Sequence, residues 1–363
     1  MNLMYYLGVK LTKNIGDGAL KALIKTKSGV GNVELLDVPE PQCTESGVKI
    51  EIKWAGICGT DLHIYYDLFR NVPPVTLCHE FSGIVTEVGT QVSKVKPGDR
   101  VVVLGSTMVR CGTCEHCKTG EYIFCATRMG MGHGGNGGFT RYVVVREDMV
   151  YKLADNVTLE IGALAEPFAC AVHAIEDTTK INVGDIVYLS GPGPIGLLCL
   201  ALLRAHGCKV IIAGTDQDQL RLEIAKELGA DVIVNVSKEN PVDVVNRETK
   251  DQGADVVIEC SGAEPSIATC LQVVKKLGKY IQLGIAGKKV SLDYDTLFYK
   301  QIQIYGSNSH NYRSWERVMR IFEQGKVDLN PVITHKMPLS KWREAFDLCE
   351  AKTCSKVLLY YDE

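Results

Sequence analysis

The sequence predicts an α/β protein in which a β-rich catalytic domain is joined to a domain built on a doubly wound parallel sheet. Three observations lead to this prediction. The chain of 363 residues is too long for one comfortable core. Residues 20–110 read as short strands broken by turns, whereas strands and helical stretches alternate from about residue 183 onward. Such alternation is typical of a parallel sheet with right-handed crossovers.

Composition and charge narrow the class of protein. Hydrophobic residues make up 46% and charged residues 23% of the chain, as in an ordinary globular protein. The net charge of −3 comes without a long run of one sign, which argues against a nucleic-acid partner. No apolar run approaches the roughly 20 residues that span a bilayer, and residues 1–10 lack the basic start and cleavage site of a signal peptide. We therefore expect neither a membrane nor a nucleic-acid partner.

The fourteen cysteines indicate a reducing compartment, the cytoplasm. Four of them crowd into the segment 111–125, and others lie in apolar stretches. Secreted disulfide proteins are usually shorter and spread their cysteines more widely. Metal ligands and buried free thiols explain this pattern better than disulfides do.

The two parts of the chain differ in their expected elements. In the first part we expect strands at 22–25, 48–55, 83–88 and 100–104, and a glycine-rich surface loop at 130–138. In the second part we expect strands at 186–190, 209–213, 255–260 and 280–283, and helices at 197–206, 217–228 and 264–276. The strand-like run 355–360 is expected to return and complete the first domain.

The loop 111–125 carries four cysteines at the spacing Cys-x2-Cys-x2-Cys-x7-Cys, namely Cys111, Cys114, Cys117 and Cys125. Zinc prefers four sulfurs in a tetrahedron, and a closed set of four leaves no position for water. The spacing therefore predicts a structural zinc. An iron–sulfur cluster is the main rival, but its usual proline after the last cysteine is replaced by Ala126. His116 is expected to face solvent, because the sulfurs already fill the coordination shell.

A second, open metal site is suggested by Cys58 and the pair His79-Glu80, which lie about twenty residues apart. A cysteine, a histidine and a carboxylate suffice for a zinc site with an open position, which can polarise an alcohol oxygen. Thr60 and His63 follow Cys58 closely and offer a route for the alcohol proton to solvent. Each residue alone is more often part of a core, so the prediction rests on their occurrence together.

Two other residues, Glu166 and Cys78, are further candidate ligands of this metal site. Glu166 is a carboxylate in an otherwise apolar stretch, and we expect it to have either a salt-bridge partner or a metal. Cys78 directly precedes His79 and is a soft ligand within reach. We interpret Cys78 as a packing residue.

A dinucleotide-binding turn is indicated by Gly191, Gly193 and Gly196, which follow an apolar strand and open a helix together with Pro194 and Ile195. In this context the glycines allow a tight turn, and pyrophosphate rests on the helix N-terminus. An acid is usual at the end of the next strand, where it hydrogen-bonds the ribose.

The position expected for that acid is instead Gly214, followed by Thr215 and Asp216. The missing acid favours NADP, whereas Asp216 reaches the ribose if the strand ends later. The choice between NAD and NADP stays open.

These motifs together resemble the zinc-containing medium-chain dehydrogenase/reductase family. The resemblance covers nearly the whole chain from about residue 20 and rests on motifs in the family's order: 58–63, His79-Glu80, the four-cysteine lobe and 191–196. It implies a GroES-like catalytic domain at 1–170 with a zinc lobe at about 108–128, a Rossmann domain at 171–310, and a returning segment at 311–363. It also implies two zinc ions per chain and a homodimer or homotetramer.

Within the family the chain is similar to the sorbitol (L-iditol) and threonine dehydrogenase branches, because Glu166-Pro167 stands where ethanol dehydrogenases use cysteine. The resemblance implies Cys58, His79 and Glu166 around the catalytic zinc, with Glu80 either an exchangeable ligand or a group behind it. Thr60 and His63 fall on the proton-relay positions.

Two departures from the family pattern bear on the substrate. Cys78 replaces the usual glycine, and the arginine that holds polyol hydroxyls has no match in 305–310. A polyol is the first expected substrate, oxidised to a ketone, and L-threonine is the alternative.

Two other classes of protein are disfavoured by the sequence. A zinc-free quinone reductase of the same superfamily lacks both the cysteine lobe and the Cys58/His79 pair. A non-enzymatic metal-binding module has no need for the glycine turn after the strand 186–190. Residues 1–19 carry no pattern that assigns them a role.

Overall fold

The computed structural model describes residues 20–362 and divides into two compact units. Residues 1–19, whose role the sequence left open, lie outside the described residues. The described part of the first unit comprises 20–166, His335–Glu350 and 356–362, and the second unit comprises Pro167–Thr334 and Ala351–Ser355. Within 20–362 no helix is long and apolar enough to cross a membrane.

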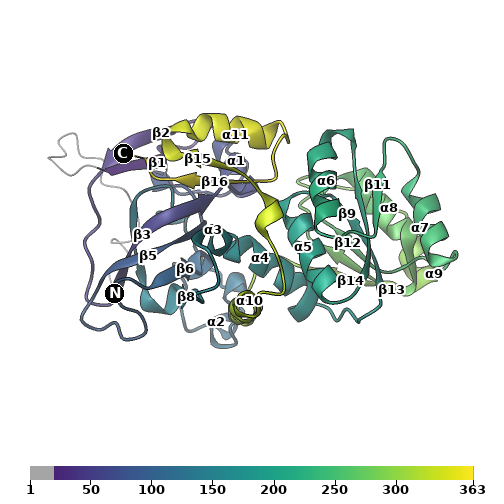
Figure 1. Ribbon diagram of the computed structural model, residues 1–363, viewed down its shortest axis with the longest axis horizontal. Helices are drawn as coiled ribbons and strands as arrows, with labels where there is room; N and C mark the ends of the chain where they lie inside the picture. The colour runs from purple at the N-terminus through teal and green to yellow at the C-terminus, as the bar shows by residue number, and fades with distance from the viewer. Residues whose placement is uncertain (1–19, 363) are drawn as a thin grey trace. The chain divides into compact units, whose positions relative to one another are not determined.

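The first unit is built mainly from antiparallel strands. The longest pairing joins β3 (Gly47–Gly56) to β5 (Glu80–Val88), and the C-terminal strand β16 (Lys356–Tyr360) pairs antiparallel with the far end of β3. Figure 1 shows these late strands in yellow beside the early strands in purple and blue. The predicted return of 355–360 to the first domain is therefore confirmed by the pairing of β16 with β3.

The strands of this unit form two sheets. The larger sheet has the order β15-β16-β3-β5-β6-β8, with β7 paired to β3, and the smaller sheet has the order β2-β1-β4. Their bounds are β1 Leu20–Lys25, β2 Val33–Val38, β4 Val75–Thr76, β6 Arg100–Val103, β7 Tyr142–Arg146, β8 Val150–Lys152 and β15 Ile333–Pro338. The helices are short: α1 Gly59–Tyr65, α2 Glu115–Lys118, α3 Leu159–Gly162, α4 Ala165–Val172, which crosses into the second unit, and α11 Trp342–Glu350.

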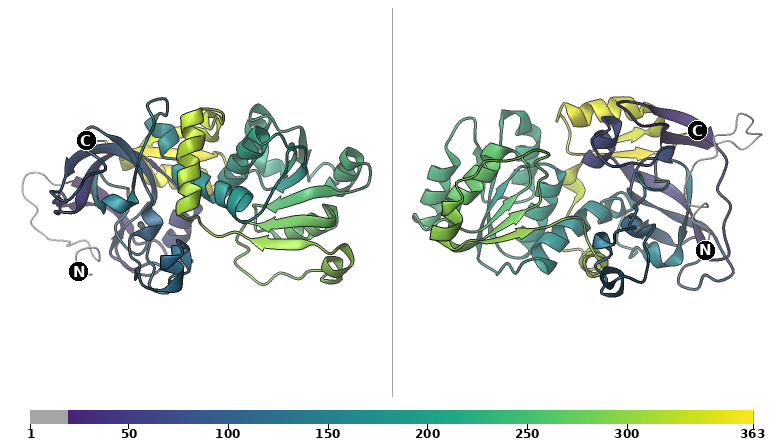
Figure 2. Two further views of the ribbon diagram at one scale, coloured as in Figure 1. Left: turned by 90° about the horizontal axis from the view of Figure 1, so that it is seen from below. Right: turned by 180° about the vertical axis from the view of Figure 1, so that it is seen from behind.

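The second unit is a six-stranded parallel sheet in the order β11-β10-β9-β12-β13-β14, which confirms the predicted strand–helix alternation. The strands are β9 Ile186–Ser190, β10 Lys209–Gly214, β11 Val232–Asn235, β12 Ala254–Glu259, β13 Val274–Gln282 and β14 Gln303–Gly306. The helices are α5 Pro194–Ala205, α6 Gln219–Glu227, α7 Pro241–Thr249, α8 Glu264–Val273, α9 Asp295–Lys300 and α10 Tyr312–Gln324. Figures 1 and 2 show helices on both faces of this sheet, with α5 and α6 opposite α7 and α8.

The helix predicted over 264–276 is too long. It ends at Val273, because Val274 turns to an extended backbone and pairs with Ala254 in the parallel sheet. The following lysines, Lys275 and Lys276, then lie in β13. Helical spacing of apolar residues could not show where sheet pairing takes over.

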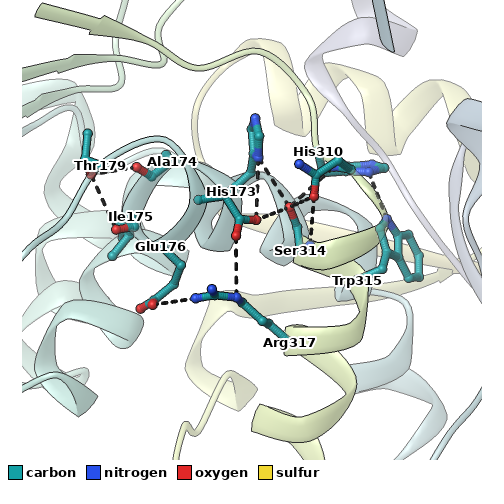
Figure 3. A network of polar contacts seen from close by, with 11 residues as sticks. His173, Ala174, Ile175, Glu176, Thr179, His310, Ser314, Trp315 and Arg317 are labelled. Atoms are coloured by element: carbon teal, nitrogen blue, oxygen red, sulfur yellow. Dashed lines mark hydrogen bonds and ion pairs between the residues drawn. The ribbon is translucent and has the colours of Figure 1, made fainter. Parts of the chain in front are cut away.

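Helix α10 lies in the second unit, although the sequence assigned 311–334 to the returning C-terminal segment. A polar network joins it to the π-helical turn His173–Asp177 (Figure 3). The Ser314 hydroxyl donates to Asp177 Oδ2 at 2.7 Å, and Arg317 Nη1 donates to Glu176 Oε2 at 2.8 Å. These contacts are between side chains far apart in sequence, which explains why the sequence placed the boundary too early.

The glycine-rich stretch 130–138, predicted to be a surface loop, is buried at every position except Asn136. It packs against the backbone that precedes His79. Gly138 N donates to Cys78 O at 3.1 Å, and a Cβ on Gly137 would lie 1.9 Å from the same oxygen. The glycines are therefore needed for close backbone approach and not for a flexible loop.

We predict that Gly137→Ala lowers the free energy of unfolding by about 2 kcal/mol, because the added methyl forces the Cys78 backbone to move. Urea unfolding measures this change. Gly306→Ala is the matched control, since nothing lies within 4 Å of the Cβ that it would add. Equal effects of the two substitutions would contradict the packing role of Gly137.

Candidate functional site

The structure brings Cys58, His79 and Glu80 together, with one ligand atom of each lying within 4.8 Å of the others. Cys58 precedes α1 as its N-cap residue, and Glu80 is the first residue of β5. Two segments about twenty residues apart thus meet where a strand pair ends and a short helix begins. A thiol, an imidazole and a carboxylate at this spacing form a donor set that suits zinc.

His79 supplies a further test of whether these residues fit a metal. Its Nδ1 is buried and has no hydrogen-bond partner among the described residues. Burial opposes protonation of the ring, but the Cys58 and Glu166 charges outweigh it and raise the pKa of His79 well above its usual value. A buried ring nitrogen without a partner, beside anionic ligands, is the setting in which a bound cation replaces a proton, so the residues fit the ion.

Asp61 joins the two segments that carry the metal-ligand candidates. Its carboxylate is fully buried and accepts the Cys58 N–H at 2.9 Å and the Cys78 N–H at 3.2 Å. Burial raises the pKa of this carboxyl. Asp61 was missed in the sequence, although its place three residues after the N-cap Cys58 is a capping-box position.

Lys356 forms a buried ion pair with Glu80. Its Nζ donates to Glu80 Oε2 at 2.7 Å and to Ile57 O at 3.0 Å, and the two side chains are only 3% and 1% exposed. Burial lowers the pKa of Lys356, but Glu80 and Cys58 outweigh burial and hold it above its usual value. Gly56 leaves room for the carboxylate, since a Cβ there would lie 2.5 Å from Oε2.

The proposed relay residues lie along α1. Thr60 is half-buried in the first turn, whereas His63 is exposed in the last turn. Residues three apart share one helix face, so the two side chains lead from the Cys58 end toward solvent.

Glu166 does not join the three-residue group within 4.8 Å, although its charge acts on His79. It lies in the first turn of α4. That Glu166 is a zinc ligand therefore stays a prediction. Cys78 also stays outside the group; it is buried, and burial raises the pKa of its thiol.

The second unit contains a buried histidine that the sequence did not single out. His310 Nδ1 accepts the Trp315 indole N–H at 2.8 Å (Figure 3), and its ring lies near Cys170. It stands in the segment 305–310, which contains no arginine that could hold polyol hydroxyls. The indole contact from α10, five residues later, helps to hold His310 in place.

The four cysteines of the 111–125 lobe converge, with their sulfurs within 4.8 Å of one another. Cys111 Sγ lies 3.9 Å from Cys117 Sγ and 3.7 Å from Cys125 Sγ. The N–H groups of Thr113 and Cys114 point at Cys111 Sγ and lower the pKa of its thiol to about 5. His116 is exposed and contacts the Phe124 ring, in agreement with a place outside the sulfur shell.

The glycine turn joins β9 to α5 in the predicted context. Gly191 has a φ of +100°, and a Cβ on Gly196 would lie 2.0 Å from Gly191 O, so both positions require glycine. Nothing lies within 4 Å of a Cβ placed on Gly193, the N-cap of α5, whose first residues are Pro194 and Ile195. This open space at a helix N-terminus fits a dinucleotide pyrophosphate.

At the ribose end, β10 terminates at Gly214, and Thr215 caps the short helical turn Asp216–Asp218. Asp216 is therefore beyond the strand and does not occupy the position expected for the acid. Its carboxylate accepts the Asn235 amide at 2.7 Å.

Comparison with known proteins gives the family of the chain. Residues 44–155 match the model of the alcohol dehydrogenase GroES-like domain, and residues 194–324 match that of the zinc-binding dehydrogenase. The chain belongs to the zinc-containing medium-chain dehydrogenase family. As a member, it is an oxidoreductase that uses zinc and NAD(P), as the sequence resemblance implied.

Several curated relatives match this dehydrogenase over nearly its full length. It is 39% identical to D-arabitol-phosphate dehydrogenase of Enterococcus avium, over 90% of this chain and 94% of that protein. It is 38% identical to sorbitol dehydrogenase of Halalkalibacterium halodurans, over 94% and 99% of the two chains. It is 35% identical to L-threonine 3-dehydrogenase of Bacillus velezensis, again over 94% and 99%.

Solved structures agree with this family and its fold. The 2R,3R-butanediol dehydrogenase of Bacillus subtilis is 31% identical with a TM-score of 0.85, covering 94% of this chain and 100% of that one. A zinc-binding dehydrogenase of Sinorhizobium meliloti bound to NADP is 28% identical with a TM-score of 0.85, covering 94% and 99%. The predicted fold, a GroES-like domain with a parallel dinucleotide-binding sheet, is confirmed.

We predict that Lys356→Met costs about 3 kcal/mol of unfolding free energy, because it leaves the Glu80 carboxylate buried without its cation. Adding Glu80→Gln should recover part of that loss. The measurement is a double-mutant cycle by urea unfolding on metal-free protein, where no ion can compensate Glu80. Additive costs of the two substitutions would contradict a coupled pair.

Proposed function

We propose that this dehydrogenase oxidises a secondary alcohol of the polyol or sugar-alcohol type to a ketone and transfers the hydride to NAD(P)+. The observation that carries this proposal is the convergence of Cys58, His79 and Glu80 in a chain that also has the glycine turn. Cys58, His79 and Glu166 would hold the catalytic zinc. Glu80 is an exchangeable ligand or a group behind the metal, since Lys356 already binds one of its oxygens.

Different residues of this chain have different roles in the proposed reaction. When bound, the zinc ion supplies Lewis-acid polarisation of the alcohol oxygen. Thr60 relays the alcohol proton by accepting it while its own hydroxyl proton moves on, and His63 passes a proton to solvent from the exposed end of α1. The glycine turn would hold the pyrophosphate, and the bound dinucleotide would supply the acceptor for the hydride that leaves the carbinol carbon. The carbon loses two electrons with the hydride, and the proton leaves separately.

L-Threonine is the second candidate substrate. The observation that favours it is the 35% identity to an L-threonine 3-dehydrogenase over nearly the full chain. The segment from Cys58 to Tyr65 also suits that branch. A panel of polyols, simple alcohols and L-threonine, each with NAD and with NADP, separates the two candidates.

The four-cysteine lobe holds a second, structural zinc in this proposal. Its support is the convergence of Cys111, Cys114, Cys117 and Cys125, which fills a tetrahedral shell and leaves no room for substrate. No disulfide links any of the fourteen cysteines, all of which lie within the described residues, and this supports a reducing compartment, the cytoplasm.

A homodimer or homotetramer also belongs to this proposal. The strand β14 is last in its sheet, and large apolar side chains are exposed on it and in the segment before it: Tyr294, Phe298, Tyr299 and Ile304. An open strand edge next to exposed aromatic residues is costly in water and suits pairing with a second copy across a two-fold axis.

We predict two zinc ions per chain, measured by elemental analysis of purified protein. Cys58→Ala should retain one zinc, lose turnover and still bind the dinucleotide, because the structural lobe and the glycine turn are separate from Cys58. Cys114→Ala is the comparison, since it should remove the structural zinc and lower thermal stability. One zinc or none in the unmodified protein, or turnover by the Cys58 variant, would reject the two-site proposal.

We predict that the protein sediments as a dimer or tetramer of its 39.8 kDa chain and that Ile304→Lys shifts it toward the monomer. The substitution places like charges opposite each other across the two-fold axis. Val183→Lys is the control, because Val183 is 81% exposed but lies before β9. A monomeric unmodified protein, or equal effects of both substitutions, would contradict this interface.

A further inference from the structure

The loop after β10 departs from the pattern that selects NAD. We propose that this chain binds the 2′-phosphorylated dinucleotide, NADPH, because Gly214 presents no carboxylate that would repel the phosphate and Lys238 supplies its positive partner. This inference rests on the proposed function, because it concerns the same dinucleotide site. In NAD-selective sites an acid at the end of this strand hydrogen-bonds the ribose and disfavours a 2′-phosphate.

Gly214 occupies the position of that acid. Strand β10 pairs in register with β9, with Ala213 opposite Ser190, and Gly191 N donates to Ala213 O at 2.9 Å. Gly214 therefore stands beside the first glycine of the turn. A Cβ on Gly214 would point at this turn and meet Pro192 Cγ at 2.7 Å and Cδ at 3.0 Å. The rigid proline ring thus excludes any side chain at 214.

The two acids that follow Gly214 do not replace the missing one. Asp218 accepts the Thr215 N–H at 3.1 Å and the Thr215 hydroxyl at 2.8 Å, so it closes the turn. Asp216 is held by the Asn235 amide at the end of β11. Both carboxylates therefore already accept hydrogen bonds from the protein, from Thr215 and from Asn235.

Lys238 supplies a cation near Gly214, the position where an acid is usual. Strand β11 pairs with β10 so that Asn235 lies opposite Gly214, and Lys238 N donates to Asn235 O at 2.9 Å. Its Nζ lies 3.8 Å from Asp216 Oδ1, and both side chains are exposed. An exposed pair of this kind is weak, so a dianionic phosphate competes effectively for the ammonium group.

Equilibrium binding of NADPH and NADH, followed by nicotinamide fluorescence without substrate, tests the inference on the full chain. We expect NADPH to bind at least as tightly as NADH. Lys238→Ala should weaken NADPH about tenfold and change NADH less than about twofold. The control Lys326→Ala, an exposed lysine just after α10, should change neither.

A second variant restores the acid. Pro192→Ala together with Gly214→Asp removes the clashing ring and should weaken NADPH about a hundredfold through like-charge repulsion, while NADH binding is retained. Thermal unfolding checks that this variant folds. The comparison of Lys238→Ala with Lys326→Ala tests the inference independently of this variant.

Binding of NADH without NADPH, or equal effects of Lys238→Ala and Lys326→Ala, would overturn this inference and leave the proposed function intact. Failure of the unmodified chain to bind either dinucleotide would overturn both.

Discussion

The first unit depends on one buried carboxylate that bridges two backbone segments. Asp61 accepts N–H groups from both Cys58 and Cys78, so α1 and the start of β5 are fixed relative to each other before any metal binds. A metal site needs its ligands within a few tenths of an ångström of the required positions, and such bridging supplies that precision. The thiol and the imidazole meet because the peptides beside them share one acceptor.

Charge and volume around this bridge are balanced by residues from distant parts of the chain. Lys356 arrives on the C-terminal strand and compensates Glu80, while Gly56 leaves the space that the carboxylate fills. The segment 130–138 closes the other side by direct backbone contact with Leu77 and Cys78. Each contribution would be unfavourable alone: a buried lysine, a buried glutamate and a run of glycines. Together they form a satisfied polar centre.

The sequence predicted what depends on local pattern and missed what depends on distant contacts. The parallel strands, the glycine turn and the cysteine lobe follow from spacing that one short segment carries by itself. The ion pair of Lys356 with Glu80 joins residues that are 276 positions apart, and no periodicity of the sequence indicates it. The glycines of 130–138 read as a surface loop because their composition is that of a turn, whereas their role is close approach to another backbone. The helix over 264–276 was overextended for the same reason, since its end is set by pairing with β12.

Cys78 shows how the first unit accommodates a strained residue. It has a φ of +82°, a left-handed conformation that suits glycine, which the family usually has at this position, and costs a residue with a Cβ about 1–2 kcal/mol. Its N–H is held by Asp61, and its carbonyl accepts the Gly138 N–H, so both peptide groups are fixed by partners outside the segment. Its thiol donates a hydrogen bond to Glu80 O at 3.3 Å. These contacts hold the strained turn in place, and the next residue, His79, lies close to Cys58.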